Sequence, residues 1–183
     1  MSTETEVKVK IDDPGEFCDW LAGLVPAIVS ERHFEDNQLL DFSDQRLKSG
    51  QCLLRIRFAE GRHFLTYKGP PRPDGIFKSR EELETTIEDG ATLLQVLQQI
   101  GLTVWFRYQK YRREFAVQGV HLAVDETPIG NYVEFEGSED GILAVAGQLG
   151  IAKPQFLRSS YYALYLEHCR DAGKMPGFMV FEL

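Results

Sequence analysis

The sequence predicts an α+β fold in which antiparallel strands dominate and, if they close into a barrel, surround a charged interior. Three observations lead to this prediction. Seven runs alternate charged and apolar residues with the two-residue period of a strand. Their charged positions are nearly all Glu, Lys or Arg, whereas a solvated face normally mixes these with Ser, Thr, Asn and Gln. Four further segments carry apolar residues at helical spacing and fit an outer cover for the sheet.

Each of the seven runs places its charged residues on one side of the predicted strand. The first run, TETEVKVK, places two acids and two bases on one side and Thr and Val on the other. Any single run also fits a sheet with one solvated face, but a barrel would turn all the charged sides into one polar tunnel. In chain order these sides carry Glu4, Glu6, Lys8 and Lys10 (residues 3–10), Arg55 and Arg57 (52–58), Lys68 (63–69), Arg80, Glu82 and Glu84 (80–87), Lys110, Arg112 and Glu114 (106–117), Asp125 (121–126), and Glu134 and Glu136 (131–137).

Four segments are expected to form helices outside the sheet. Asp13 and Pro14 supply an N-cap and a first-turn proline for the first of them. Gly101 and Gly150 follow the apolar spacing of the second and third and mark their ends. Pro154 is expected to open the fourth. The predicted helical segments are residues 14–25, 90–101, 139–150 and 154–173.

Composition indicates one domain over residues 1–183. The chain has 43% hydrophobic and 26% charged residues, which is ordinary for a globular protein, and no linker interrupts it. The longest apolar stretch, residues 20–29, is too short to cross a bilayer and contains Pro26. The polar N-terminus does not have the pattern of a signal peptide, so we expect a cytoplasmic protein. The three cysteines, widely spaced and odd in number, are expected to be buried free thiols: Cys18, Cys52 and Cys169.

The charge balance restricts the partners. A net charge of −8 disfavours a nucleic-acid or anionic-membrane surface, because such surfaces need a positive field spread over a face. The bases are instead concentrated in the strand-like runs, where rows of Lys and Arg suit a small ligand rich in phosphate oxygens. We therefore expect a small-molecule partner, no nucleic acid and no membrane.

The motifs, taken together, resemble those of one family. Glu4-x-Glu6-x-Lys8 is followed in order by LLRIR, LTYKGP, SREELE, KYRREF and VDETPIGNYVEFEG. This series resembles the CYTH domain family, also called triphosphate tunnel metalloenzymes, along nearly the whole chain. The resemblance implies an eight-stranded antiparallel tunnel and an enzyme that processes a triphosphate with Mg²⁺ or Mn²⁺. It also implies that Glu4, Glu6 and Lys8 form the catalytic signature.

The expected roles of the tunnel residues follow from charge and from this resemblance. A triphosphate needs cations spread along a groove, whereas Mg²⁺ or Mn²⁺ needs converging carboxylates. Three residues, Asp125, Glu114 and Tyr161, are expected to support the binding groups rather than touch the substrate. The expected triphosphate-binding residues are Lys8, Lys10, Arg55, Arg57, Lys68, Arg80, Lys110 and Arg112, and the expected metal ligands are Glu4, Glu6, Glu82, Glu84, Glu134 and Glu136.

Three functions remain open at this level. We expect hydrolysis of inorganic triphosphate, ATP or thiamine triphosphate, with phosphoryl transfer driven by positioning and charge. The alternative is a class IV-type adenylyl cyclase, which makes cyclic AMP and pyrophosphate. Such cyclases often carry a His-Phe pair before the ExExK signature, and here only Met1, Ser2 and Thr3 precede Glu4. A non-enzymatic polyphosphate- or nucleotide-binding module is the third, although it would gain nothing from six acids. The organic group, the metal and the oligomeric state, monomer or homodimer, stay undetermined.

Overall fold

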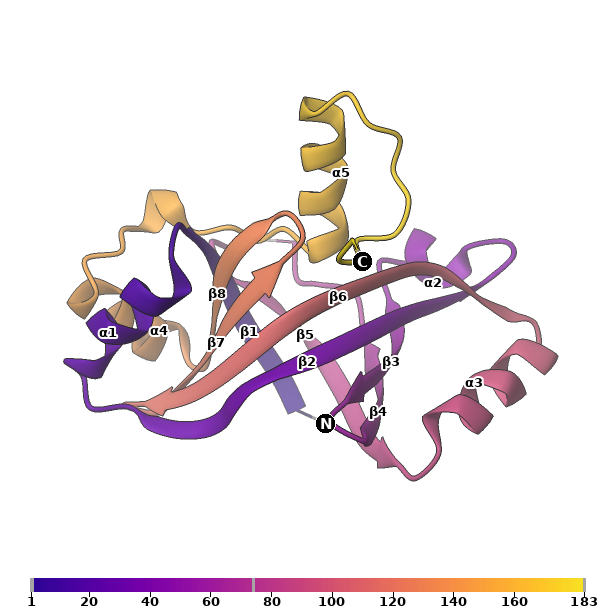
Figure 1. The fold of residues 1–183 in the computed structure, drawn as a ribbon, viewed down its shortest axis with the longest axis horizontal. Helices are drawn as coiled ribbons and strands as arrows, with labels where there is room; N and C mark the ends of the chain where they lie inside the picture. Colours follow the sequence, from indigo (N-terminus) through magenta and orange to yellow (C-terminus); the bar gives the residue numbers. More distant parts are fainter. Residues whose placement is uncertain (1, 74, 183) are drawn as a thin grey trace.

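The fold is a closed barrel of eight antiparallel strands with helices outside it, seen in a computed structural model that describes residues 2–73 and 75–182 (Figure 1). Around the barrel the strands follow the order β1-β5-β4-β3-β2-β6-β7-β8, and β1 closes it by pairing with both β5 and β8. The strands are β1 (Ser2–Ile11), β2 (Ala27–Phe42), β3 (Leu53–Ala59), β4 (Arg62–Lys68), β5 (Lys78–Ile87), β6 (Leu102–Val117), β7 (Val120–Thr127) and β8 (Gly130–Glu136).

Polar caps set the beginnings of the longer helices, because each cap accepts a backbone N–H that has no partner within its helix. Asp13 caps α1 as predicted, by accepting from the Glu16 N–H at 2.9 Å. Asp89, Ser138 and Ser160 cap three later helices in the same way. The helices are α1 (Pro14–Ala22), α2 (Arg46–Ser49), α3 (Gly90–Gln99), α4 (Glu139–Gln148) and α5 (Tyr161–Asp171), and a 3₁₀ turn spans Lys153–Gln155.

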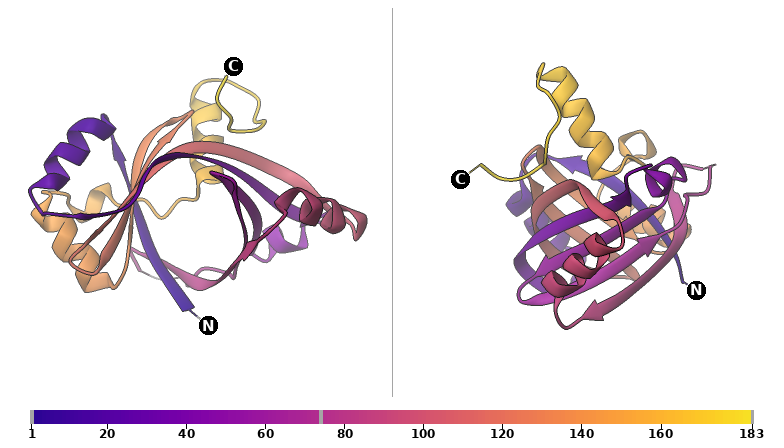
Figure 2. Two further views of the ribbon diagram at one scale, coloured as in Figure 1. Left: turned by 60° about the horizontal axis from the view of Figure 1, so that its bottom comes forward. Right: turned by 90° about the vertical axis from the view of Figure 1, so that its right-hand side faces the viewer.

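The helices cover parts of the outer surface. Figures 1 and 2 show α1 and α4 side by side at one end of the molecule and α3 at the other, with α5 standing over the barrel. Phe17 and Leu21 of α1 and Ile142 and Val145 of α4 pack in one apolar cluster with the outward sides of β1, β7 and β8. This burial outside the barrel leaves its interior to polar groups. The cover is incomplete, since Leu83 on the outer side of β5 is 49% exposed.

Strand β2 is the element that the alternation pattern missed. The seven predicted runs correspond to β1 and to β3 through β8, whereas residues 27–42 were assigned to no strand. Its inward side mixes the buried Glu35 with the buried Leu39, and its outward side mixes Asp36 with the buried Leu40. Because neither side is uniformly charged or apolar, the period of two does not stand out.

The last helix begins later than predicted. It starts at Tyr161 and not at Pro154, because the intervening chain pairs with β1. The Leu157 N–H donates to the Lys8 carbonyl at 2.8 Å and the Lys8 N–H donates to the Leu157 carbonyl at 3.0 Å. An extended segment that makes these bonds cannot be helical, so the helix begins only after the N-cap residue Ser160. Pro154 opens only the 3₁₀ turn.

The cysteines and the helices bear on two further expectations. All three cysteines are free, but only Cys169 is buried, whereas Cys18 and Cys52 are half-buried. The expectation of buried thiols was therefore wrong for two of them.

Among the helices of the described chain, none is both long and apolar enough to cross a membrane.

Candidate active site

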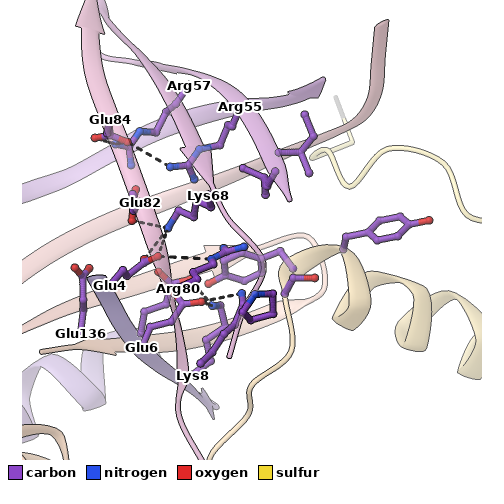
Figure 3. A pocket seen from close by; sticks show the side chains of 18 of the residues that line it. Glu4, Glu6, Lys8, Arg55, Arg57, Lys68, Arg80, Glu82, Glu84 and Glu136 are labelled. Atoms are coloured by element: carbon purple, nitrogen blue, oxygen red, sulfur yellow. Dashed lines mark hydrogen bonds and ion pairs between the residues drawn. The ribbon is translucent and has the colours of Figure 1, made fainter. Parts of the chain in front are cut away.

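The barrel encloses a cavity of about 660 Å³ that is lined by charged side chains. Nine Lys and Arg residues and seven Glu residues of the described chain line it, although the protein as a whole has a net charge of −8. Figure 3 shows labelled acids facing labelled bases in the cavity, with dashed lines joining several of the acid–base pairs. The structure thus brings together side chains from most of the predicted strands, among them Glu4, Arg55, Lys68, Glu82, Lys110 and Glu134.

Lys68 links two carboxylates from neighbouring strands. Its Nζ lies 2.6 Å from Glu4 Oε1 and 2.9 Å from Glu82 Oε2, which β1 and β5 place on either side of it. Burial raises the pKa of Glu4 to about 7, with Lys68 acting against this shift and the carboxylates of Glu6 and Glu82 adding smaller contributions to it. Burial in this part of the tunnel therefore favours the protonated form of Glu4.

Glu6 joins two lysines at the next position along β1. Its Oε1 lies 3.3 Å from Lys8 Nζ and 2.9 Å from Lys78 Nζ. Burial alone would raise the pKa of Glu6, but the two ammonium groups reverse this and hold the pKa far below its usual range. Burial lowers the pKa of Lys78 to about 8, and the positive charges of Lys8 and Arg80 add to this effect. Lys78 is thus the cation of this group that gives up its proton most easily.

The paired arginines of β3 face the cavity together. Arg57 Nη2 donates to both oxygens of Glu84 at 3.0 and 3.1 Å. Arg55 donates to Tyr108 Oη at 3.1 Å and to Thr66 Oγ1 at 3.2 Å. The side chains of Arg55 and Arg57 are 11% and 14% exposed, so both are largely buried.

Asp125 gathers three donors at the inner wall. Arg112 donates to it through Nε and Nη2 at 2.7 and 2.6 Å, and Lys110 Nζ lies 2.8 Å away. Tyr161 of α5 donates its hydroxyl to Asp125 Oδ2 at 2.6 Å. Arg112 also reaches Glu134 at 2.6 Å, and Glu134 in turn lies 3.0 Å from Lys8. These bonds fix the bases of β6 and β1 relative to each other.

Several arginine donors in the tunnel have no partner. The Nε atoms of Arg55, Arg57 and Arg80 are buried and make no hydrogen bond within the described chain. A buried donor without a partner costs free energy, so native proteins seldom leave three in one cavity. The tunnel therefore offers unused donors to an anionic ligand.

Three predicted site residues lie differently from the rest. Lys10 is exposed and is not among the residues that line the cavity. It lies opposite Tyr132 of β8, near the end of β1 and outside the tunnel. Glu136 lines the cavity but is exposed and forms no ion pair within the described chain. Burial of its carboxyl group still raises the pKa of Glu136. Glu114 contacts His121 at 3.3 Å rather than a predicted binding residue.

The sequence interpretation missed three charged residues of the site, Glu35, Lys48 and Lys78. Glu35 of β2 is 2% exposed and lies 3.3 Å from Arg57 and 3.7 Å from Lys110. The sequence pattern predicted no strand over residues 27–42, so Glu35 was not grouped with the inward-facing residues of any strand. Lys78 lies on the same side of β5 as Arg80, and extending that run by two residues would have included it.

The glutamates do not form a preassembled metal centre. Within the described residues, no three carboxylate, imidazole or thiol groups are close enough together to hold an ion. The ion pairs with Lys68, Lys8 and Arg57 explain this, because each base draws a carboxylate to itself.

Comparisons with known proteins agree with this geometry. The sequence model of the CYTH domain matches residues 2–161. A protein of Methanocaldococcus jannaschii named "Putative adenylate cyclase MJ0240" is 29% identical over 172 residues, which cover 88% of this chain and 97% of that protein. The structure of PH1819 from Pyrococcus horikoshii is 26% identical, with a TM-score of 0.72 over 90% of this chain and 98% of that one. The Hippeastrum protein HpAC1 shares the fold, with 21% identity and a TM-score of 0.63 over 94% of this chain and 97% of that one. This protein is therefore a member of the CYTH domain family.

Proposed function

We propose that this protein is a divalent-metal-dependent enzyme that hydrolyses the triphosphate chain of a small molecule inside the tunnel. Residues 1–183 act as one domain in this proposal. Lys8, Arg55, Arg57, Lys68, Arg80, Lys110 and Arg112 hold the phosphates, and the exposed Lys10 is left out of that set. Lys78 and Glu35 join the site, since they contact Glu6 and Arg57 respectively.

The unpaired arginine donors are the observation that carries the proposal. The buried Nε atoms of Arg55, Arg57 and Arg80 come from two strands and serve one enclosed space. A triphosphate has rows of acceptor oxygens that match such donors, and its charge compensates the bases. Phosphoryl transfer then requires mainly positioning and neutralisation of charge on the phosphoryl oxygens, which the fixed bases of the cavity supply.

The acids of the tunnel fit Mg²⁺ or Mn²⁺ in the type of their donor atoms. Carboxylate oxygens are the ligands that both ions prefer, and the cavity lining includes the carboxylates of Glu4, Glu82 and Glu136. Glu4, Glu6, Glu82, Glu84, Glu134 and Glu136 would supply the ligands. A bound ion would supply charge compensation for the phosphates. The protein's own bases hold and orient the chain, and Asp125 keeps Arg112 and Lys110 in place.

Two relatives support the choice of substrate class. The Hippeastrum protein with the same fold is described as having a dominant triphosphatase activity. The Methanocaldococcus jannaschii relative is named as an adenylate cyclase, and this favours cyclisation of ATP as the second candidate function. Both reactions start from a triphosphate held by the same row of bases. They differ in the nucleophile, which is water in one and the ribose 3′-hydroxyl in the other.

Product analysis tests the proposal. The protein is incubated with ATP, inorganic triphosphate or thiamine triphosphate, each with Mg²⁺, Mn²⁺ or excess EDTA, and products are separated by anion-exchange chromatography. Hydrolysis predicts orthophosphate with either metal and none with EDTA. Cyclic AMP and pyrophosphate from ATP would establish the cyclase instead, and no turnover under any condition would refute both.

Two lysines of β1 provide a matched pair of variants. Lys8 is 3% exposed inside the tunnel, whereas Lys10, two residues later on the same strand, is exposed outside it. Lys8→Met should lower kcat/KM by roughly 100-fold or more, because it removes a cation from the reacting phosphates. Lys10→Met should retain activity. Equal activity of the two variants, with thermal melts showing that both are folded, would contradict the proposed site.

A further inference from the structure

The two ends of the cavity differ in chemistry. At one end the lining is acidic and includes Glu82, Glu84, Glu114 and Glu136. At the other end, toward α2 and the start of α5, the lining includes aromatic and aliphatic side chains. That second end, called here the aromatic end, contains Leu39, Leu53, Trp105 and Tyr162 with one base, Lys48, beside the polar Gln51, Cys52 and Ser160. A triphosphate chain has no apolar surface, so it does not account for these residues.

The strands place the aromatic end next to the phosphate-binding bases. On β3, Leu53 is two residues before Arg55 on the same side of the strand, about 7 Å along it. On β6, Trp105 and Tyr108 precede Lys110, and the Tyr108 hydroxyl already contacts Arg55 at 3.1 Å. A ligand with its phosphates on Arg55 would therefore place its organic group at this end.

A β-bulge places Trp105 at the cavity. In the pairing of β2 with β6, Leu39 lies opposite Phe106 and Leu40 opposite Val104, so Trp105 is the extra residue. Bulges re-aim side chains and often occur beside active sites. Phe106 is buried in the cluster under α5, whereas Trp105 is half-buried and lines the cavity. Tyr162 of α5 meets the Trp105 ring in a T-shaped contact, with 4.9 Å between the ring centroids, and the rest of this half-buried ring lines the cavity.

Lys48 sets the charge of the aromatic end. Its Nζ lies 4.5 Å from the centre of the Trp105 ring and 4.7 Å from that of Tyr162, and it donates to the Tyr162 hydroxyl at 3.2 Å. An ammonium group has three donors, so two remain for a ligand. Purine and pyrimidine bases present ring nitrogens and carbonyl oxygens that accept such bonds. The thiazolium ring of thiamine is positively charged, and Lys48 would repel it.

We propose that the aromatic end binds the base of a nucleoside triphosphate, which stacks on Trp105 and accepts a hydrogen bond from Lys48. The inference rests on the proposed function and names the organic part of its substrate. The cavity volume of about 660 Å³ lies within the range of pockets that hold ligands of this size.

A comparison of substrates tests the proposal kinetically. Trp105→Leu keeps an apolar side chain but removes the flat ring, and Trp20→Leu, a half-exposed tryptophan on α1, is the matched control. Loss of base stacking should lower kcat/KM for ATP about 5- to 150-fold more than kcat/KM for inorganic triphosphate. The control should lower neither. Lys48→Met should raise the ratio of thiamine triphosphate turnover to ATP turnover.

Tryptophan fluorescence tests binding without turnover. The chain contains two tryptophans, so Trp20→Phe leaves Trp105 as the sole indole. In EDTA, ATP should quench this fluorescence and inorganic triphosphate should leave it nearly unchanged. Because the titration needs no catalysis, it decides this inference even if the proposed enzymatic function fails. Equal quenching by both ligands, no quenching by ATP, or an equal loss of both activities in Trp105→Leu would each overturn the aromatic end as a base-binding site.

Discussion

Asp125 holds Arg112 through two parallel hydrogen bonds, from Nε at 2.7 Å and from Nη2 at 2.6 Å. The carboxylate is fully buried and also accepts from Lys110 and Tyr161. Its single negative charge lies between two cations and reduces their mutual repulsion within the wall of the tunnel. A two-point bond fixes the plane of the guanidinium group as well as its position.

Loss of this carboxylate should destabilise the protein. Asp125→Asn leaves Arg112 and Lys110 buried with less compensation, and breaking a buried ion pair on one side costs about 3–5 kcal/mol. Glu126→Gln is the neighbouring control, since Glu126 pairs with Arg32 at the surface and such pairs contribute about 0–1 kcal/mol. Urea unfolding measures both. A loss of less than about 1 kcal/mol in Asp125→Asn would show that the buried network is not needed for stability.

The paired arginines should matter more for turnover than for folding. If Arg55 and Arg57 contact the triphosphate, Arg55→Ala or Arg57→Ala should cost about 2–4 kcal/mol of transition-state stabilisation, or roughly 30- to 1,000-fold in kcat/KM. Arg62→Ala, on the exposed start of β4, is the control and should change kcat/KM little. Near-wild-type kcat/KM in both tunnel variants, with unchanged melts, would remove the arginines from the mechanism.

Glu136 offers the cleaner test of the metal ligands. It lines the cavity without an ion pair in the described chain, so Glu136→Gln should raise the Mg²⁺ concentration needed for half-maximal activity and leave the melting temperature unchanged. Glu134 pairs with Lys8 and Arg112, so Glu134→Gln should lower both activity and stability. A metal titration of kcat beside a thermal melt separates the two. An unchanged Mg²⁺ requirement in Glu136→Gln would exclude that residue as a ligand.

Glu4 should make the stability of the metal-free protein depend on pH. Its pKa is raised from 4.5 to about 7 on folding, chiefly by burial, so the folded state favours the protonated form. The free energy of unfolding contributed by this group is therefore highest below pH 4.5 and falls as the pH rises to about 7, by about 3 kcal/mol at most. Glu4→Gln cannot ionise and should gain stability relative to the wild type over that interval.

Urea unfolding in EDTA at pH 5, 6, 7 and 8 measures this difference. Glu81→Gln, on the opposite side of β5 from Glu82, controls for the exchange of Glu for Gln. A difference between Glu4→Gln and the wild type that stays constant from pH 5 to pH 8 would contradict the raised pKa.

The alternation of side chains predicted most of the barrel, because seven strands place their charged residues of the tunnel on one side and apolar residues on the other. Strand β2 could not be found in this way, since Leu39 faces the interior while Asp36 faces outward and pairs with Arg107. A two-residue period reveals a strand only where one side of the strand carries polar residues and the other side carries apolar residues. Pro154 likewise suggested a helix start, but backbone pairing between Leu157 and Lys8 is a tertiary contact that no local pattern shows.

The residues that line the cavity match the sequence prediction where charge repeats along a strand and differ from it where strands end. Lys10 shares a side with Lys8, yet β1 has left the tunnel by that point, and alternation does not report the length of a barrel. Glu134 and Glu136 looked equivalent in the sequence, but Glu134 lies against two bases and Glu136 lies at the open end. Trp105 faces the cavity only because of a bulge, which interrupts the alternation itself.

The pairing of nearly every tunnel base with a glutamate makes ligand binding an exchange of partners. Lys68, Arg57 and Lys8 already hold carboxylates where phosphate oxygens would bind. Under the proposed function, a phosphate that displaced one of these carboxylates from its base would free oxygens that a divalent ion could then bind. Each ligand would thus lower the free-energy cost of binding the other, and by thermodynamic reciprocity the coupling would be equal in both directions. The glutamates of the tunnel would then compete with phosphate for the same bases, and a bound metal ion would weaken that competition.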